Sequence, residues 1–119
     1  MIIGLPKEIK TNEYRVAATP SAVAALVRRG NTVLFEADCG KGSGFSDESY
    51  IQAGGQLRPR EEVYQQCDML YKVKEIEPSE YDLLHEGQIV FTYLHSNAHP
   101  EMTRELLERG VTGIAYEDI

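Results

Sequence analysis

The stretch Gln88-Ile-Val-Phe-Thr-Tyr-Leu-His95-Ser-Asn-Ala-His-Pro100 decides how the rest of the chain is interpreted. Its apolar run, Ile89 to Leu94, is too short for an isolated helix and is rich in β-branched and aromatic residues, which is typical of a buried strand. The run ends at His95, and a helical pattern begins at Pro100. Open α/β sheets bind their ligands outside the carboxyl ends of their strands. His95 is therefore the first candidate for a functional residue.

Strand and helix patterns alternate on both sides of this stretch. The predicted strands cover residues 1–5, 32–37, 69–73, 89–94 and 111–115, with a minor strand at 56–58. The predicted helices begin at residues 20, 47, 60, 78 and 100, and the Thr19-Pro20 and Ser46 positions suit helix N-termini. This alternation predicts an α/β domain: a parallel sheet of about five strands with helices on both faces, a flavodoxin-like or Rossmann-like three-layer fold.

Length and composition place the chain among ordinary globular proteins. Its 119 residues are enough for one domain with its own core, and its apolar content of 42% and charged content of 26% are typical. A net charge of −7 argues against non-specific nucleic-acid binding, which relies on lysine and arginine. No apolar run is long enough for a membrane helix, and the N-terminal residues lack the pattern of a secretory signal, so a cytoplasmic protein is expected. Cys39 and Cys67 are isolated and are expected to be reduced, inert thiols.

Two motifs resemble ligand-binding sites, one for a dinucleotide and one for a metal ion, but neither has the required residues. Glycines at positions 40, 42 and 44 give the spacing G-x-G-x-G, whereas a dinucleotide fingerprint needs G-x-G-x-x-G directly between a strand and a helix. Phe45 also fills the place where a backbone would approach a pyrophosphate, so a tight loop is the plainer account. His95 and His99 are four residues apart, but no carboxylate or cysteine completes a metal-ligand set.

Three cationic residues are better candidates for a ligand-binding site than these motifs. Arg15 follows the first strand, and Lys72 and Lys74 lie at the end of the 69–73 strand. Since side chains in a strand alternate, the two lysines should point to one face, and in a parallel sheet Lys74 and His95 should emerge at the same edge. An arginine can hold a carboxylate through two hydrogen bonds, a lysine can polarise a carbonyl, and a histidine can transfer protons near neutral pH. An arginine, a lysine and a histidine at one edge of the sheet would together suit the binding of a small oxo-acid.

Each of these residues also has a plainer interpretation. Arg15 could be a surface cation paired with Glu13 or Glu8, and Lys72 and Lys74 could be solvated surface residues. A histidine after an apolar strand is more often structural than catalytic. His85 at a helix end and His99 before Pro100 have no catalytic role in this interpretation, since a cation at a helix C-terminus complements the dipole.

Several motifs together resemble the N-terminal domain of alanine dehydrogenase, in that family's order and spacing, over nearly the whole chain. The motifs are Gly4-Leu-Pro-Lys-Glu8-Ile, Arg15-Val-Ala-Ala-Thr-Pro20, Gly42-Ser-Gly-Phe-Ser-Asp47, Lys72-Val-Lys-Glu75, Gly87-Gln-Ile-Val-Phe-Thr-Tyr-Leu-His95 and Gly113-Ile-Ala-Tyr-Glu117. The wider family includes the α subunit of nicotinamide nucleotide transhydrogenase. That branch lacks the Lys-Val-Lys-Glu form and the histidine at the place of His95, so the chain looks like the dehydrogenase branch.

The resemblance implies roles for three residues. Arg15 would bind the substrate carboxylate, Lys74 would contact the carboxylate or the reacting carbonyl oxygen, and His95 would be the general acid/base. The implied reaction is the reversible, NAD-dependent oxidation of L-alanine to an imine, followed by hydrolysis to pyruvate and ammonia. One departure concerns His99, which stands where the family usually has an aspartate before the proline, and it leaves the exact amino acid open.

In the family this segment precedes an NAD-binding Rossmann domain, so residues 1–119 are expected to be the substrate domain of a longer enzyme and inactive alone. The expected partners are alanine and pyruvate, with NAD bound mainly by the other domain, no metal, no nucleic acid, no membrane insertion, and a homo-oligomeric full-length protein. Three alternatives stay open: the transhydrogenase α subunit, a related amino- or imino-acid dehydrogenase, and a non-catalytic module that binds small carboxylates.

Overall fold

One parallel sheet organises the chain. The computed structural model describes residues 1–10, 13–93 and 100–115. These residues form a six-stranded sheet in the order β3-β2-β1-β4-β5-β6, and every neighbouring pair is parallel. The strands are β1 (Ile2–Leu5), β2 (Thr32–Phe35), β3 (Gln56–Leu57), β4 (Met69–Tyr71), β5 (Ile89–Thr92) and β6 (Thr112–Ala115). The α/β prediction is confirmed, and the strand count exceeds the predicted five because the short β3 joins the sheet.

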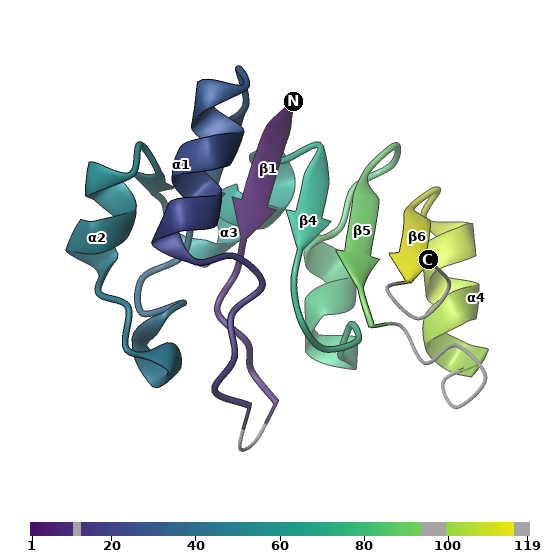
Figure 1. Ribbon diagram of the computed structural model, residues 1–119. Coiled ribbons are helices and arrows are strands. Elements are labelled where there is room, and N and C mark those ends of the chain that lie inside the picture. The colour runs from purple at the N-terminus through teal and green to yellow at the C-terminus, as the bar shows by residue number, and fades with distance from the viewer. Residues whose placement is uncertain (11–12, 94–99, 116–119) are drawn as a thin grey trace.

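Helices cover both faces of this sheet. The helix α1 (Pro20–Arg28) lies in front of the sheet in Figure 1 with α2 (Asp47–Gln52) beside it, whereas α3 (Arg60–Gln66) and α4 (Pro100–Glu108) lie behind. Two 3₁₀ helices, η1 (Lys41–Ser43) and η2 (Pro78–Leu83), complete the described elements. The helix predicted from residue 78 is therefore a 3₁₀ helix, which begins with a capping box between Glu77 and Glu80. Within the described ranges no helix is long and apolar enough to cross a membrane.

The helix starts follow from local sequence. The Thr19 side chain accepts a hydrogen bond from the backbone N–H of Ala22 at 3.2 Å, and Pro20 occupies the first turn of α1. The Ser46 side chain accepts from the N–H of Ser49 at 3.2 Å at the start of α2. Both predicted N-caps are confirmed, and each provides an acceptor for a backbone N–H that has no partner inside its helix.

The core consists of two apolar layers separated by the sheet. Consecutive residues of β2 contribute to opposite layers: Val33 and Phe35 pack with Tyr50 on one side, and Leu34 packs with Tyr64 on the other. This alternation explains why the central strands β1, β2, β4 and β5 are apolar over most of their length, since both of their faces are covered by helices.

The strand order also marks where a ligand would bind. The chain adds β2 and β3 on one side of β1 and then crosses to add β4, β5 and β6 on the other. This is the strand order of the doubly wound dinucleotide-binding fold, in which ligands lie outside the carboxyl ends of the strands where the order reverses. Here that place lies between the ends of β1 and β4, at the lower edge of the sheet in Figure 1.

Candidate functional site

The segments that follow β1 and β4 form the candidate site, and Glu13 is the residue that connects them. The Arg15 guanidinium donates to both carboxylate oxygens of Glu13, through Nε and Nη2, each at 3.0 Å. The backbone N–H of Arg15 also donates to Glu13, at 2.8 Å. The hydrogen bond from Arg15 lowers the pKa of Glu13, and the hydrogen bond to Glu13 raises the pKa of Arg15. The interpretation of Arg15 as a cation paired with Glu13 thus describes its contact correctly.

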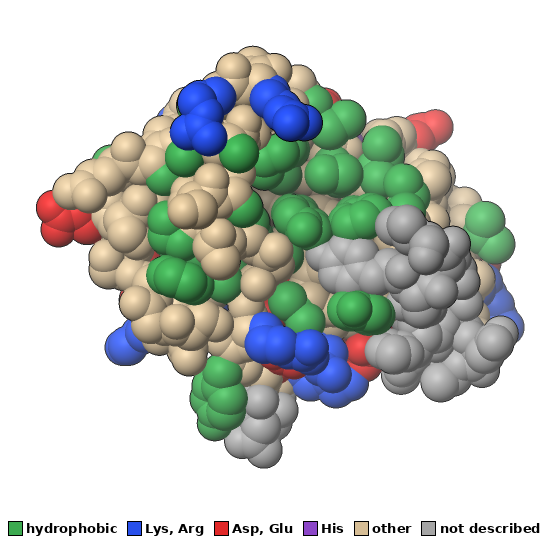
Figure 2. Space-filling view, in the orientation of Figure 1, with side chains coloured by type: hydrophobic (Ala, Val, Ile, Leu, Met, Phe, Trp, Pro, Cys, Tyr) green, Lys and Arg blue, Asp and Glu red, His purple; other side chains and the backbone are tan. Residues whose placement is uncertain are grey.

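Lys74 reaches the same carboxylate from the other segment. Its Nζ lies 3.9 Å from Oε1 of Glu13, the oxygen that Arg15 Nη2 also contacts, and 30% of its side chain is exposed. The structure therefore brings Arg15 and Lys74 together at the carboxyl ends of β1 and β4, as the parallel topology predicts. Figure 2 shows a group of basic side chains at this lower edge, where the strand arrows of Figure 1 end.

Lys72 was expected to share a face with Lys74 or to be solvated at the surface, and both expectations are wrong. Lys72 is only 2% exposed, and its Nζ donates to Oε1 of Glu8 at 3.2 Å. The physical reason is that β4 ends at Tyr71 and the chain bends at residues 73 and 74, so strand alternation does not continue through Lys74.

Of the three histidines, only His85 lies among the residues that the structure describes. His95 and His99 lie outside the described residues, and their roles stay predictions. His85 is described and is tied to the backbone: its Nε2 lies 2.9 Å from the carbonyl oxygen of Cys67, and its Nδ1 lies 3.1 Å from that of Glu86. His85 directly follows Leu84, the C-cap residue of η2, as the sequence suggested, and these contacts give it a structural role near the amino ends of β4 and β5.

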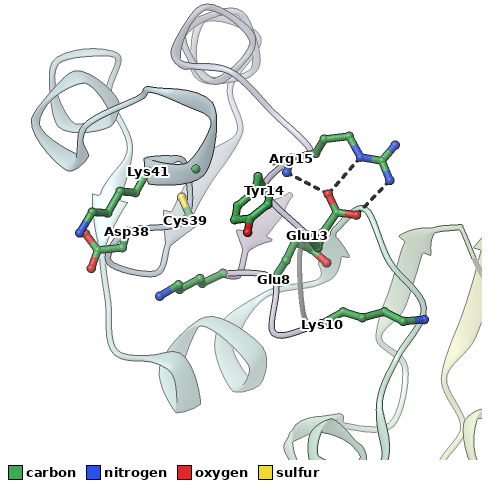
Figure 3. A pocket seen from close by; sticks show the side chains of 10 residues that line it. Glu8, Lys10, Glu13, Tyr14, Arg15, Asp38, Cys39 and Lys41 are labelled. Atoms are coloured by element: carbon green, nitrogen blue, oxygen red, sulfur yellow. Dashed lines mark hydrogen bonds and ion pairs between the residues drawn. The ribbon is translucent and has the colours of Figure 1, made fainter.

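Two cavities flank the segment that follows β1, and Arg15 lines both. The larger, about 520 Å³, is drawn in Figure 3. Its lining includes Glu8, Tyr14 and Arg15 on the side of β1 and Cys39 and Lys41 on the other side. The second, about 310 Å³, opens between the segment from Arg15 to Thr19 and the ends of β4 and β5. Its lining includes Arg15, Val16, Thr19, Phe45, Tyr71 and Tyr93. Tyr93, which is 38% exposed, is the last described residue before His95, so the end of β5 leads into this cavity.

The glycine-rich loop packs against the segment that carries Arg15. Residues 41–43 form η1, and the Ser43 hydroxyl donates to the carbonyl oxygen of Tyr14 at 2.7 Å. A Cβ on Gly42 would come within 2.9 Å of that same oxygen. Because the Tyr14 backbone occupies the space beside the loop, the loop is a tight turn that supports the site, as expected from its glycine spacing.

Neither cysteine has the environment of a reactive thiol. Both are buried, and burial raises the pKa of Cys39 to about 12 and that of Cys67 to about 11. Since the thiolate is the reactive form, both are expected to be inert, as the sequence suggested. Among the described residues no group of three histidine, cysteine, aspartate or glutamate side chains could hold a metal ion.

Three acidic residues at the site were not singled out from the sequence as functional. Glu13 and Glu8 were weighed only as possible partners of Arg15. The burial of Glu8 and Glu80 could not be predicted, because it depends on contacts with distant residues. The spacing Glu13-x-Arg15 was the one available hint, since it allows the bidentate pair that the structure shows.

Comparisons with known proteins agree with this architecture. The family model described as "Alanine dehydrogenase/PNT, N-terminal domain" matches residues 4–119. An alanine dehydrogenase from Methanococcus maripaludis is 49% identical over 120 residues, and one from Bacillus subtilis is 47% identical over 119 residues. Each match covers 100% of this chain and 32% of the relative, so the chain spans about a third of the length of these relatives.

Solved structures give the same result. A structure described as L-alanine dehydrogenase superposes with a TM-score of 0.95 at 48% identity, covering 98% of this chain and 32% of that one. A transhydrogenase from Sinorhizobium meliloti superposes with a TM-score of 0.93 at 27% identity, covering 98% of this chain and 35% of that one. The higher identity favours the dehydrogenase branch over the transhydrogenase branch. The chain belongs to the alanine dehydrogenase/PNT N-terminal domain family.

Proposed function

We propose that residues 1–119 are the substrate domain of an NAD-dependent L-alanine dehydrogenase, which interconverts L-alanine with pyruvate and ammonia. The observation that carries this proposal is the meeting of Arg15 and Lys74 at one carboxylate oxygen of Glu13, at the point where the strand order reverses. Two cations at this place suit a small anionic substrate, and relatives with this domain are named alanine dehydrogenase.

Arg15 binds the substrate carboxylate in this proposal. Its contacts among the described residues use Nε and Nη2, so the edge formed by Nη1 and Nη2 is the one directed to a ligand. Glu13 fixes the orientation of the guanidinium before the substrate arrives. A bidentate arginine–carboxylate pair combines charge with a defined direction, which a small substrate needs in order to be held in one orientation.

Lys74 acts on the oxo group. Its ammonium lies beside the Arg15 pair, with part of its side chain exposed. A positive charge at this place would stabilise the negative charge that develops on the carbonyl oxygen of pyruvate.

His95 is the general acid/base of the proposal. It lies outside the described residues, and its assignment rests on its position two residues after Tyr93, which lines the same 310 Å³ cavity as Arg15. Proton transfer at the substrate carbon requires a group that titrates near neutral pH, and histidine is that group.

The dinucleotide is assigned to the part of the longer protein outside residues 1–119. The glycine-rich loop has the backbone of Tyr14 at its side, so it does not offer the open cradle that a pyrophosphate needs. NAD would accept the hydride from alanine, and the residues described here would bind and orient the substrate. A fragment limited to residues 1–119 is then expected to lack activity.

The decisive experiment measures NADH production by the full-length protein with L-alanine and NAD. The proposal predicts turnover with alanine and reductive amination of pyruvate in reverse. A much lower but still measurable kcat/KM in Lys74→Ala, with wild-type activity in the exposed control variant Glu108→Gln, supports the assigned site. Transfer of hydride between NADPH and an NAD analogue without turnover of alanine would instead identify the transhydrogenase branch.

A further inference from the structure

A buried group of charges lies directly beneath Lys74. Glu8 is 8% exposed, Lys72 is 2% exposed and Glu80 is 0% exposed, and these residues come from three separate segments of the chain. The Lys72 ammonium lies 3.2 Å from Oε1 of Glu8 and 3.7 Å from Oε2 of Glu80. Burying charged groups costs free energy, and a buried ion pair is often no more stabilising than an apolar pair of the same volume. The role of these buried charges is therefore better explained by the backbone that they hold in place than by a gain in stability.

Glu8 holds the backbone that leads into Lys74. Its Oε2 accepts a hydrogen bond from the backbone N–H of Val73 at 2.9 Å, and its Oε1 accepts from the N–H of Lys74 at 3.1 Å. One carboxylate thus binds two successive peptide N–H groups and the ammonium of Lys72. Such charge-assisted hydrogen bonds are shorter and stronger than neutral ones, and together they fix the peptide plane between residues 73 and 74.

Lys72 holds the other side of the same residue. Its Nζ donates to the carbonyl oxygen of Lys74 at 2.8 Å and to that of Glu75 at 3.4 Å. The Thr92 hydroxyl on β5 also donates to the Lys74 carbonyl, at 2.7 Å. Both backbone polar groups of Lys74 are therefore bound by buried side chains.

These contacts set the direction of the Lys74 side chain. The chain leaves β4 at Tyr71 and bends at residues 73 and 74. The bend directs Lys72 inward to Glu8, whereas the Lys74 ammonium lies beside Glu13 at 3.9 Å. If the bend relaxed, the amine of Lys74 would move relative to Arg15.

We propose that Glu8 and Lys72 are positioning residues that fix the backbone of residues 73–75 and so hold the Lys74 amine beside Arg15. This inference rests on the proposed function, in which Lys74 contacts the substrate. Neither Glu8 nor Lys72 touches the substrate in this proposal, and each acts through Lys74.

The test is a double-mutant cycle in the full-length enzyme. Glu8→Gln replaces one of the two acceptor oxygens by an amide, and it is measured alone and together with Lys74→Ala. In the enzyme that keeps Lys74, Glu8→Gln should lower kcat/KM for pyruvate on the order of 10- to 100-fold, because small displacements of a catalytic group have large effects on rate. In the Lys74→Ala enzyme the same change should alter kcat/KM by less than about twofold, since there is no amine left to misplace. Glu108→Gln is the matched control, and it should change neither enzyme.

Thr92→Val gives a second, milder probe of the same peptide. It removes one hydrogen bond to the Lys74 carbonyl while nearly keeping the side-chain volume, so it tests the proposal if Glu8→Gln does not fold. Its effect should likewise be confined to the enzyme that keeps Lys74. An equal loss in the two backgrounds, or no loss in either, would overturn the positioning role.

A readout without turnover separates this inference from the proposed function. An amine-acylating reagent, followed by peptide mass spectrometry, gives the modification rate of each lysine. Glu8→Gln or Thr92→Val should change the rate at Lys74 and leave the exposed Lys41 unchanged. Unchanged labelling of Lys74 would refute positioning even if the enzyme is an alanine dehydrogenase. Conversely, wild-type protein without alanine turnover would refute the proposed function, while altered labelling would still support the positioning of Lys74.

Discussion

The ammonium of Lys74 lies 3.9 Å from Oε1 of Glu13. The same oxygen accepts a hydrogen bond from Nη2 of Arg15 at 3.0 Å. One carboxylate therefore stands between two cations that come from segments on opposite sides of the point where the strand order reverses. It offsets their mutual repulsion and holds both side chains at one place, where the proposed function requires two cations for a substrate carboxylate.

The Glu13 ion pair predicts a specific dependence of stability on pH. Arg15 lowers the pKa of Glu13 in the folded protein. The stabilisation that the ion pair contributes is therefore fully present above the pKa of an unfolded glutamate, about 4.3. It is lost as the pH falls through the lower pKa of Glu13 in the folded protein. Full-length wild-type protein should have a higher Tm than Glu13→Gln at neutral pH, and this difference should shrink only below about pH 4.3. Thermal unfolding between pH 7 and pH 3 measures it. A Tm difference that stays constant down to pH 3 would contradict the prediction, and Glu108→Gln, at an exposed position, serves as the control.

Replacing Arg15 should show whether a bidentate contact is required. Arg15→Ala removes a charge-assisted hydrogen-bonding group, so kcat/KM for pyruvate should fall roughly 10- to 100-fold, mostly through a higher KM. Arg15→Lys keeps the charge but has no planar fork, and it should recover only a small part of the loss. Steady-state kinetics of reductive amination measure both variants. An unchanged KM in Arg15→Ala would remove the carboxylate-binding role.

Local patterns predicted much of the fold, because the strands are apolar runs bounded by glycine, proline and helix caps. The Thr19 and Ser46 caps depend on residues within one helical turn, so the sequence shows them directly. The two-residue β3 was predicted only as a minor strand, since it is short and both of its residues are exposed. It belongs to the sheet because it pairs with β2, which is a tertiary contact.

The site was predicted in part. Parallel topology is sufficient to place Arg15 and Lys74 at one edge of the sheet, and the structure brings them to Glu13. The burial of Lys72 could not be predicted, because an isolated lysine is expected at the surface and its partner Glu8 is 64 residues away. The backbone at the bend after Tyr71 donates to that same distant Glu8, through the N–H groups of Val73 and Lys74. The roles of Arg15, Lys74 and His95 stay predictions.

Gly4 on the central strand β1 should tolerate no side chain. A Cβ there would lie 2.7 Å from Sγ of Cys67 and 3.0 Å from the carbonyl oxygen of Val63 on α3. Gly4→Ala should therefore destabilise the protein by about 1–3 kcal/mol, because α3 must move away from the sheet. Cys67→Ala in the same protein removes the sulfur and should recover part of this loss, while the contacts with the Cβ of residue 67, at 2.9 Å, and with the Val63 carbonyl remain. Denaturant unfolding measures both variants, and a loss that Cys67→Ala leaves unchanged would contradict the predicted clash.

His95 and His85 offer a comparison within one chain. His95→Ala should lower kcat roughly 100- to 10,000-fold and leave KM for pyruvate nearly unchanged, because a general acid/base acts in the transition state. The pH profile of the residual activity should lose the limb that titrates near neutral pH. His85→Gln is the control, since the His85 ring contacts the backbone of Cys67 and Glu86 away from Arg15 and Lys74, and it should keep the wild-type pH profile. Wild-type turnover in His95→Ala, or loss of the limb near neutral pH in His85→Gln, would show that another group transfers the proton. Lys74 would then be the first residue to test, because its amine lies beside Arg15 at the same edge of the sheet.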